Sequence, residues 1–264
     1  MTIILYTLAV SAGLALLLGF LLGFFKKIFF VETDETVAKV RECLPGANCG
    51  GCGYPGCDGF AQAVAKGEAP ATGCTAGGRE TAEKVGKVLG VSANVVETVA
   101  VLACQGSKAH AVPKGFYSGV QTCRAAKLST NSIKMCAWAC QGLGDCVAVC
   151  QFDALHMGDD SLPHVDEEKC TGCGMCIKEC PQNLLVHFNK IDKGAFARCN
   201  NRNPNKPQIL KGCKVGCIKC GKCEKACQVD AIHLVNGIPV VDYAKCNSCG
   251  DCVAACPTNV LYLR

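Results

Sequence analysis

Residues 170–181 read Cys170-Thr-Gly-Cys173-Gly-Met-Cys176-Ile-Lys-Glu-Cys180-Pro181. Three cysteines at every third residue, followed by a fourth and a proline, form the short loop that wraps an iron-sulfur cube. The spacing returns at Cys246, Cys249, Cys252, Cys256 and Pro257, and again at Cys217, Cys220, Cys223 and Cys227, where Gln228 replaces the proline. Coincidence explains three such runs poorly, so we expect the protein to transfer electrons through iron-sulfur clusters.

The N-terminal segment predicts a membrane anchor. Residues 3–25 form an apolar run without a charge, long enough to cross a bilayer, and Lys26 and Lys27 follow directly. A cleaved signal peptide is the alternative, but no basic residue precedes the apolar core and no small-residue cleavage site follows it. We therefore expect residues 1–27 to be an uncleaved, single-pass anchor in the cell membrane.

The compartment decides how the cysteines are used. A chain of 264 residues with 25 cysteines is either a disulfide scaffold or a metal protein. Basic residues next to a first span tend to stay in the cytoplasm, so the domains after Lys27 should lie on the cytoplasmic side. Thiols stay reduced there, which favours metal binding over disulfides.

Residues 31–102 predict a small, mainly helical domain with one 4Fe-4S cluster. Helix-like stretches cover residues 36–44, 58–66 and 79–89, around a glycine-rich loop. The loop reads Cys49-Gly-Gly-Cys52-Gly-Tyr-Pro-Gly-Cys57, and Cys74 follows. Glycines let backbone amides approach the sulfurs of a cluster. Zinc also takes four thiolates, but this spacing is not the usual pair of knuckles.

The remainder of the chain is an internal duplication with an offset of 76 or 77 residues. The sequence Cys150-Gln-Phe-Asp-Ala-Leu-His156 parallels Cys227-Gln-Val-Asp-Ala-Ile-His233. The full ladder matches Cys123, Cys136, Cys140, Cys146, Cys150, Cys170, Cys173, Cys176 and Cys180 with Cys199, Cys213, Cys217, Cys223, Cys227, Cys246, Cys249, Cys252 and Cys256. We therefore predict an α+β protein in which two tandem modules, residues 103–190 and 191–264, follow the anchor and the helical domain.

Each copy resembles the bacterial two-cluster ferredoxin, in which the fourth cysteine of one run ligates the other cluster. The resemblance implies three complete ligand sets: Cys217, Cys220, Cys223 and Cys256; Cys227, Cys246, Cys249 and Cys252; and Cys150, Cys170, Cys173 and Cys176. The companion of the last set is irregular, because Leu143 occupies the position of Cys220.

The irregular set leaves several alternatives open. Cys140, Cys146 and Cys180 need a fourth ligand, for which Cys136 is the nearest candidate, followed by Cys104 and Cys123. A cluster with an open iron site, or no cluster there, is the other alternative. With the N-terminal loop, the resemblance implies about five 4Fe-4S clusters.

The cysteines left over allow two interpretations. They are Cys43, Cys199, Cys213 and two of Cys104, Cys123 and Cys136. Buried free thiols are ordinary packing residues, although most of these recur in both copies. The alternative is a sixth cluster built partly from Cys104, Cys123 and Cys136.

The combination of an N-terminal span, the loop Asn48-Cys-Gly-Gly-Cys-Gly-Tyr-Pro-Gly-Cys57 with Cys74, and ferredoxin modules resembles the B subunit of the Rnf complex. That family is a membrane-bound translocase that oxidises reduced ferredoxin, reduces NAD and moves sodium ions or protons. The resemblance implies an electron-transfer subunit, with reduced ferredoxin as donor and other membrane and peripheral Rnf subunits as partners. Shorter members have one ferredoxin module, whereas this chain has two. No glycine-rich dinucleotide fingerprint follows a strand, so we expect NAD to bind to another subunit.

A basic stretch suggests where a donor docks. Ten basic residues lie between Lys190 and Lys225, against only Asp192 and Glu224. An acidic ferredoxin would be steered to such a surface. The alternative is that these cations offset the negative charge of thiolate-bound clusters.

Three other functions are less consistent with the sequence. The stretch Cys213-Lys-Val-Gly-Cys217-Ile-Lys-Cys220 has the spacing of a radical iron-sulfur enzyme, but too little chain follows for a barrel. A zinc-binding interaction module would share the cysteines but be redox silent. The basic stretch lacks interleaved aromatic residues, so we expect no nucleic-acid partner.

Overall fold

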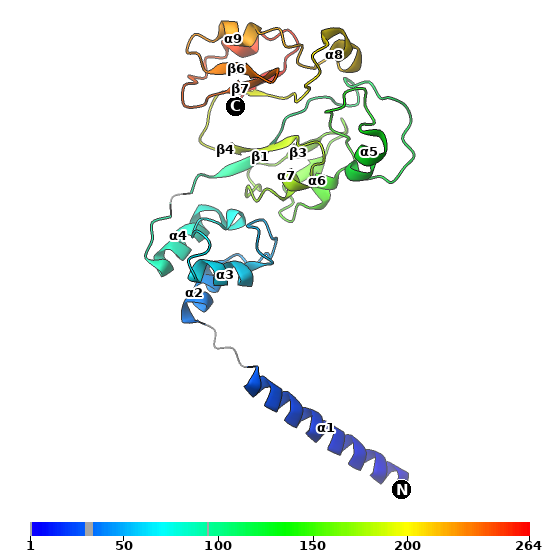
Figure 1. The fold of residues 1–264 in the computed structure, drawn as a ribbon, viewed down its shortest axis with the longest axis vertical. Helices are drawn as coiled ribbons and strands as arrows, with labels where there is room; N and C mark the ends of the chain where they lie inside the picture. Colours follow the sequence, from blue (N-terminus) through cyan, green and yellow to red (C-terminus); the bar gives the residue numbers. More distant parts are fainter. Residues whose placement is uncertain (1, 30–33, 94) are drawn as a thin grey trace.

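The computed structural model describes residues 2–29, 34–93 and 95–264, so the predicted start of the N-terminal domain at residue 31 lies outside the described residues. Along the long axis of the molecule, a single helix is followed by a small helical domain and then by two strand-containing halves (Figure 1). The described chain therefore mixes helices and strands, as the α+β prediction requires.

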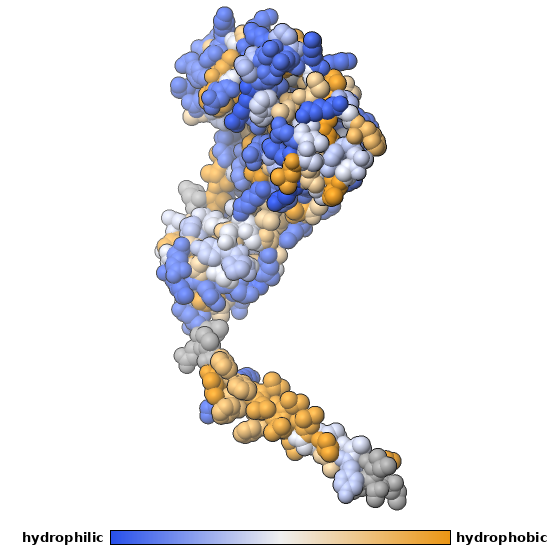
Figure 2. Space-filling view, turned by 45° about the vertical axis from the view of Figure 1, so that its right-hand side comes forward, coloured by the Kyte–Doolittle hydropathy of each residue, from blue (hydrophilic) through white to orange (hydrophobic). Residues whose placement is uncertain are grey.

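Helix α1 (Thr2–Ile28) is long and apolar enough to span a membrane between Tyr6 and Ile28. It stands apart from the rest of the described protein, and Figure 2 shows its surface as mostly hydrophobic, with a paler section towards the N-terminal end. Lys26 and Lys27 lie in its last turn, where cations also interact favourably with the helix dipole. An apolar helix of this length needs lipid or partner helices around it.

Three helices and a short 3₁₀ turn form the N-terminal domain. They are α2 (Glu35–Cys43), α3 (Cys57–Ala65), η1 (Thr75–Gly77) and α4 (Gly78–Leu89), and each α-helix begins one residue before the predicted stretch. The Asp34 carboxylate caps α2 by accepting the Thr36 N–H at 2.8 Å. Apolar side chains from the three helices, including Val40, Phe60 and Val85, form the core.

The strands of the described residues form four two-stranded antiparallel sheets. In the first half, β1 (Thr98–Leu102) pairs with β4 (Leu185–Asn189) around the hairpin of β2 (Leu155–Met157) and β3 (Pro163–Val165). In the second half, β5 (Ala195–Ala197) pairs with β8 (Leu261–Leu263) around β6 (Ile232–Val235) and β7 (Ile238–Val241). The expected boundary at residue 102 assigned β1 to the N-terminal domain, yet its partner is the last strand of the first half.

Short helices connect the strands. They are α6 (Asp145–Ala148) and α7 (Met175–Glu179) in the first half, and α9 (Lys222–Ala226) and α10 (Asp251–Ala254) in the second. Each half also carries one longer helix after its first strand, α5 (Cys123–Thr130) or α8 (Lys206–Gly212).

The two halves contact each other through aromatic rings and backbone hydrogen bonds. Phe188 of β4 packs edge-on against Tyr243, with ring centroids 5.0 Å apart, and against Phe196 of β5 at 5.8 Å. The Gln105 N–H donates to the Arg198 carbonyl at 3.1 Å. These contacts hold the cysteine-bearing loops of both halves in a defined arrangement.

Candidate iron-sulfur sites

One loop geometry occurs four times in the strand-containing halves. Gly144, Gly174, Gly221 and Gly250 have positive φ angles between 71° and 85°, and each directly precedes one of the short helices. A side chain there would cost roughly 1–2 kcal/mol, which explains the glycines. The turn brings the residue before the glycine close to the cysteine on the first turn of the helix. Leu143 precedes Gly144, so this loop keeps its shape without its thiol.

Four cysteines of the N-terminal domain line one small cavity. They are Cys49, Cys52, Cys57 and Cys74, the predicted set, which we call site A. The Cys57 N–H donates to Asn48 Oδ1 at 2.8 Å, which fixes the glycine-rich loop against the start of α3. Burial raises the pKa of the Cys74 thiol, and the proximity of Cys57, Cys52 and Cys49 raises it further.

The second half contains two such cavities. Site B is lined by Cys217, Cys220, Cys223 and Cys256, and site C by Cys227, Cys246, Cys249 and Cys252. The fourth cysteine of each run lines the site of the other run, and its sulfur accepts a backbone amide. Val260 N–H donates to Cys256 Sγ at 3.3 Å, and Ala231 N–H donates to Cys227 Sγ at 3.2 Å. The structure thus brings together both sets that the ferredoxin resemblance implied.

Burial and backbone amides act in opposite directions on these thiols. Burial raises the pKa of Cys252 to about 11, and the nearby Cys227 and Cys246 add to the shift. Burial also acts on Cys256, but the backbone amides of Thr258 and Val260 outweigh it and bring the pKa of Cys256 below its ordinary value. Amides that favour the thiolate are what a sulfur ligand of iron requires.

The first half contains the third predicted set. Site D consists of Cys150, Cys170, Cys173 and Cys176. Burial raises the pKa of Cys176 to about 12, and the proximity of the other three thiols contributes. The Ala100 N–H of β1 donates to Cys170 Sγ at 3.5 Å, so this strand lies directly beside the site.

In the irregular set of the first half, Cys123 lies beside the segment that bears Cys146, because the Cys123 N–H donates to Asp145. Burial raises the pKa of Cys146 to about 12, and the thiols of Cys180 and Cys123 add to the shift. Burial also raises the pKa of Cys140, to which Cys104 and, less strongly, Cys123 contribute. We call Cys123, Cys140, Cys146 and Cys180 site E. Cys136 instead lines a separate cavity with Cys104, Cys199 and Cys213, which differs from the expectation that Cys136 completes this set.

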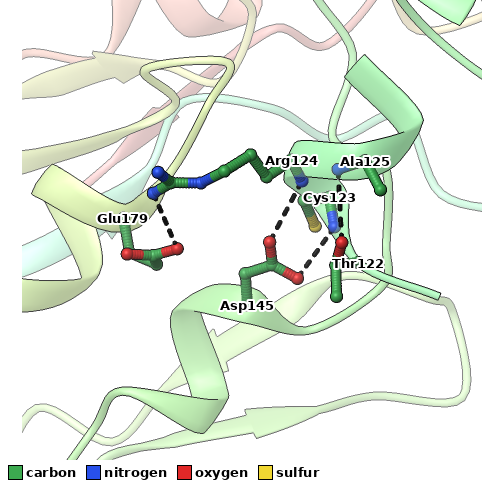
Figure 3. A network of polar contacts seen from close by, with 6 residues as sticks. All are labelled: Thr122, Cys123, Arg124, Ala125, Asp145 and Glu179. Atoms are coloured by element: carbon green, nitrogen blue, oxygen red, sulfur yellow. Dashed lines mark hydrogen bonds and ion pairs between the residues drawn. The ribbon is translucent and has the colours of Figure 1, made fainter. Parts of the chain in front are cut away.

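A polar network holds Cys123 in this position (Figure 3). Asp145 accepts the Cys123 N–H at 2.8 Å and the Arg124 N–H at 3.1 Å through its two carboxylate oxygens. The Arg124 guanidinium pairs with Glu179 at 3.0 Å. Because these three residues adjoin Cys123, Cys146 and Cys180 in sequence, the network aligns the segments that bear three of the thiols.

Neighbouring sites are close to one another. Lys178 Nζ donates to the Gly51 carbonyl at 3.2 Å, which joins site D to the N-terminal domain. The Cys49 thiol of site A is near enough to Cys173 of site D to raise its pKa, after the larger effect of burial. Cys176 of site D likewise raises the pKa of Cys146 of site E, after the larger effect of burial. Sites A, D and E therefore form a series.

The arrangement fits cubes better than single metal ions. Among the described residues, no three Cys, His, Asp or Glu side chains converge closely enough to hold one ion. In a cube each thiolate bonds a different iron, so the sulfurs stand apart around a void. Zinc would draw four sulfurs to about 2.3 Å from one point. The thiolate donor set, the cavities and the amide donors all suit a 4Fe-4S cluster.

The remaining chemistry-bearing residues take structural roles. Cys43 lies outside every site, and its thiol donates to the Lys39 carbonyl at 3.3 Å. His233 pairs with Glu224 at 3.2 Å, and His164 with Asp160 at 3.0 Å. Both imidazoles are exposed.

Family models match three regions of the chain. An Fe-S cluster family covers residues 44–76, a 4Fe-4S binding domain covers residues 163–186, and a 4Fe-4S dicluster domain covers residues 216–260. The matched regions contain site A, the run of site D, and all the cysteines of sites B and C. Residues 104–150 and 199–213 lie outside all three matches.

Curated relatives align with nearly the whole chain. The B subunit of the ion-translocating oxidoreductase complex of Methanosarcina acetivorans is 38% identical over 100% of this chain and 99% of its own length. The B subunit of the Na⁺-translocating ferredoxin:NAD⁺ oxidoreductase complex of Acetobacterium woodii is 39% identical over 98% of this chain and 77% of its own. The proton-translocating counterpart of Clostridium ljungdahlii is 38% identical over 99% and 93%.

Proposed function

This chain belongs to the B subunits of ion-translocating oxidoreductase (Rnf) complexes and is an iron-sulfur electron-transfer subunit, and we propose that it passes electrons from reduced ferredoxin towards the NAD-reducing part of the complex. The relatives from Acetobacterium and Clostridium are named as ferredoxin:NAD⁺ oxidoreductase subunits, which supports this donor and acceptor. The other subunits of the complex are its partners. The chain has no glycine-rich dinucleotide fingerprint, so NAD binds to one of those partners.

The cofactors that we assign are 4Fe-4S clusters at sites A to E. When bound, such clusters supply one-electron transfer with little rearrangement. The chain holds them with twenty thiolates, in which Cys123 rather than Cys136 completes site E. Backbone amides donate to the sulfurs at the same place in three loops: Leu184 to Cys180, Ala231 to Cys227 and Val260 to Cys256, at 3.2–3.4 Å. These amides stabilise negative charge on sulfur and so help to set each potential.

The observation that carries the proposal is the series of adjacent sites. Lys178 of α7 donates to the Gly51 carbonyl, which lies between two thiols of site A, and α7 itself bears Cys176 of site D and is capped by Cys180 of site E. Sites B and C share α9, which bears Cys223 and is capped by Cys227. An electron can therefore move by short steps within each of these two series, along sites A, D and E and between sites B and C.

We also propose that the two strand-containing halves are tandem ferredoxin-like modules. The support is that each half pairs its first strand with its last around an inner hairpin. Because β1 pairs with β4, the first module begins before residue 98 rather than at residue 103.

Exposed cations of the second half form the docking surface that we propose for ferredoxin. Lys206 and Lys211 lie on α8, Lys214 follows it, and Lys222 and Lys225 lie on α9. All five are exposed, and none forms a salt bridge with a described residue. The upper end of the molecule, where these helices lie, is largely hydrophilic in Figures 1 and 2. Such a surface would attract an acidic electron carrier.

Rapid mixing of reduced ferredoxin with the anaerobically purified chain tests this function. Absorbance bleaching and electron spin resonance should report reduction of the clusters, and the rate should fall as salt rises. The double variant Lys222→Glu, Lys225→Glu should slow the second-order reduction about tenfold, whereas Lys87→Glu in α4 should leave it unchanged. Clusters that ferredoxin does not reduce would contradict the proposed function. Reduction at a rate independent of salt and of both variants would contradict the docking surface alone.

Helix α1 is the membrane anchor in this proposal, with the cluster-bearing domains on the cytoplasmic side. The support is its apolar length and the two lysines at its C-terminal end. The full chain should stay in the membrane pellet during an alkaline carbonate wash. Protease added to sealed, right-side-out vesicles should leave the domains intact, and cleavage there would contradict the orientation.

A further inference from the structure

A further set of four thiols lies between the two halves, outside the three regions that family models match. Cys104, Cys136, Cys199 and Cys213 line a small cavity, similar in size to those of sites A and B. We call it the junction site. It differs from the sixth cluster that the sequence suggested, because two of its thiols come from the second half and Cys123 is not among them.

The junction site takes an equivalent pair of thiols from each half. Cys104 lies two residues beyond the end of β1, and Cys199 lies two residues beyond the end of β5. Cys136 and Cys213 occupy matching positions in the duplicated sequence, each two residues after a lysine. A chance group of packing thiols would not be expected to repeat in this way.

Backbone amides are directed at the thiols of the junction site. Gly106 N–H donates to Cys104 Sγ at 3.4 Å, and Cys217 N–H donates to Cys199 Sγ at 3.3 Å. The distances match those of the amide contacts in sites B, C and E. Cys199 and Cys213 are buried, and Cys104 and Cys136 are half-buried. Four thiols so close together need a positive partner to ionise.

The polypeptide around the junction site is tied together from both halves. Gln105 Nε2 donates to the Val215 carbonyl at 2.9 Å, and Val112 N–H donates to the Gly212 carbonyl at 2.9 Å. Lys134, only 6% exposed, donates to the Gly106 carbonyl at 2.7 Å. A buried ammonium is costly unless negative charge lies near it, and thiolate-bound iron would supply that charge.

We propose that Cys104, Cys136, Cys199 and Cys213 hold a sixth 4Fe-4S cluster, which connects the two halves electrically. The inference rests on the proposed function, since it assigns the same kind of cofactor. Ala139, which adjoins Cys140 of site E, lines the junction site together with Cys104, and Cys199 accepts the amide of Cys217 of site B. The junction site therefore closes the gap between sites E and B, and joins A, D and E to B and C. It also uses every cysteine of the chain except Cys43.

Iron and acid-labile sulfide per chain test this inference on the full-length protein, purified anaerobically in detergent. Six cubes require about 24 irons, and five require about 20. A value near 24, with a matching mass in native mass spectrometry, is the expected result. A reproducible value near 20 overturns the junction cluster and leaves the proposed function standing. Absence of iron overturns both.

Single substitutions identify the ligands independently of the total. Cys136→Ala and Cys213→Ala should each remove about one to four irons, and one cluster signal should disappear or change to that of a three-iron cluster. Cys43→Ala is the matched control and should keep the full count. If either ligand variant fails to fold, the iron count of the unmodified chain still decides. Folded variants with unchanged iron and unchanged spin resonance would overturn the assignment.

Discussion

The two strand-containing halves differ in the segments that bear their proposed cluster ligands. In the second half, Cys220 and Gly221 form a regular loop, and all eight thiols of sites B and C come from the repeated runs. In the first half, Leu143 stands at the equivalent position before Gly144, and we assign the fourth thiol of site E to Cys123 at the start of α5. The loop keeps the same shape in both halves although one ligand has moved.

An insertion accounts for the difference. In the first half, residues 105–135 separate Cys104 from Cys136. In the second half, only residues 200–212 separate Cys199 from Cys213. The extra segment contains α5 and Cys123. In our assignment, this longer segment supplies through Cys123 the ligand that the loop of the first half lacks at Leu143. A thiolate can reach a cluster from any segment that brings its sulfur to the right place.

The largest expected effect follows from moving this ligand to the loop. Cys123→Ala should remove the cluster of site E, with a loss of up to about four irons, because only three thiols remain there. Adding Leu143→Cys to that variant should restore the count, since Gly144 already has the φ of the regular loops. Iron analysis and spin resonance of both variants check this.

A single substitution in the same loop is the control for this prediction. Leu143→Cys alone should leave the iron content unchanged, because site E already has four thiols. A Cys123→Ala variant that keeps all its iron would break the distinction between the halves, and would return Cys136 or an open iron site to consideration.

A second contrast lies in a pair of equivalent lysines. Lys134 is buried and donates to Gly106, whereas Lys211, its counterpart in the duplicated sequence, is exposed on α8. The Lys134 ammonium lies near Cys140 and Cys213 and counters the effect of burial on their pKa values. Lys134→Met should therefore lower the midpoint potential of the nearest clusters by tens of millivolts, on the order of 30–60 mV, because a reduced cluster carries more negative charge.

Redox titration followed by spin resonance measures this shift. Lys211→Met is the matched control, and its exposed ammonium is screened by water, so the potentials should not move. Equal shifts in the two variants would mean that burial of Lys134 does not distinguish the halves.

The sequence predicted local features well and contacts between distant segments poorly. The runs around Cys170 and Cys246, the glycine-rich loop and the three helices of the N-terminal domain depend on short spacings, which a single sequence displays directly. The position of Cys123 depends instead on Asp145 and Arg124, which act across a fold that spacing does not describe.

Aligning the two sequence copies at a constant offset also paired thiols that are not equivalent in the fold. A constant offset matched Cys123 with Cys199, but the strands pair Cys104 with Cys199. The ends of β1 and β5, Leu102 and Ala197, are separated by 95 residues, whereas the starts of β4 and β8, Leu185 and Leu261, are separated by 76. Only the strand register shows the insertion that shifts the cysteine positions of one copy relative to the other.

The smallest expected effect concerns the aspartates that begin α6 and α10. Asp145 accepts two amides at the start of α5, whereas Asp251, its counterpart, has no such hydrogen bond to a described residue. Asp145→Ala should cost about 1 kcal/mol, the usual loss for a helix cap, because Thr122 still caps α5 by accepting the Ala125 N–H at 3.2 Å. Release of iron to a chelator should become roughly fivefold faster for one cluster. Asp251→Ala should release iron at the unmodified rate, and similar acceleration in both variants would show that the network in Figure 3 does not hold Cys123 in place.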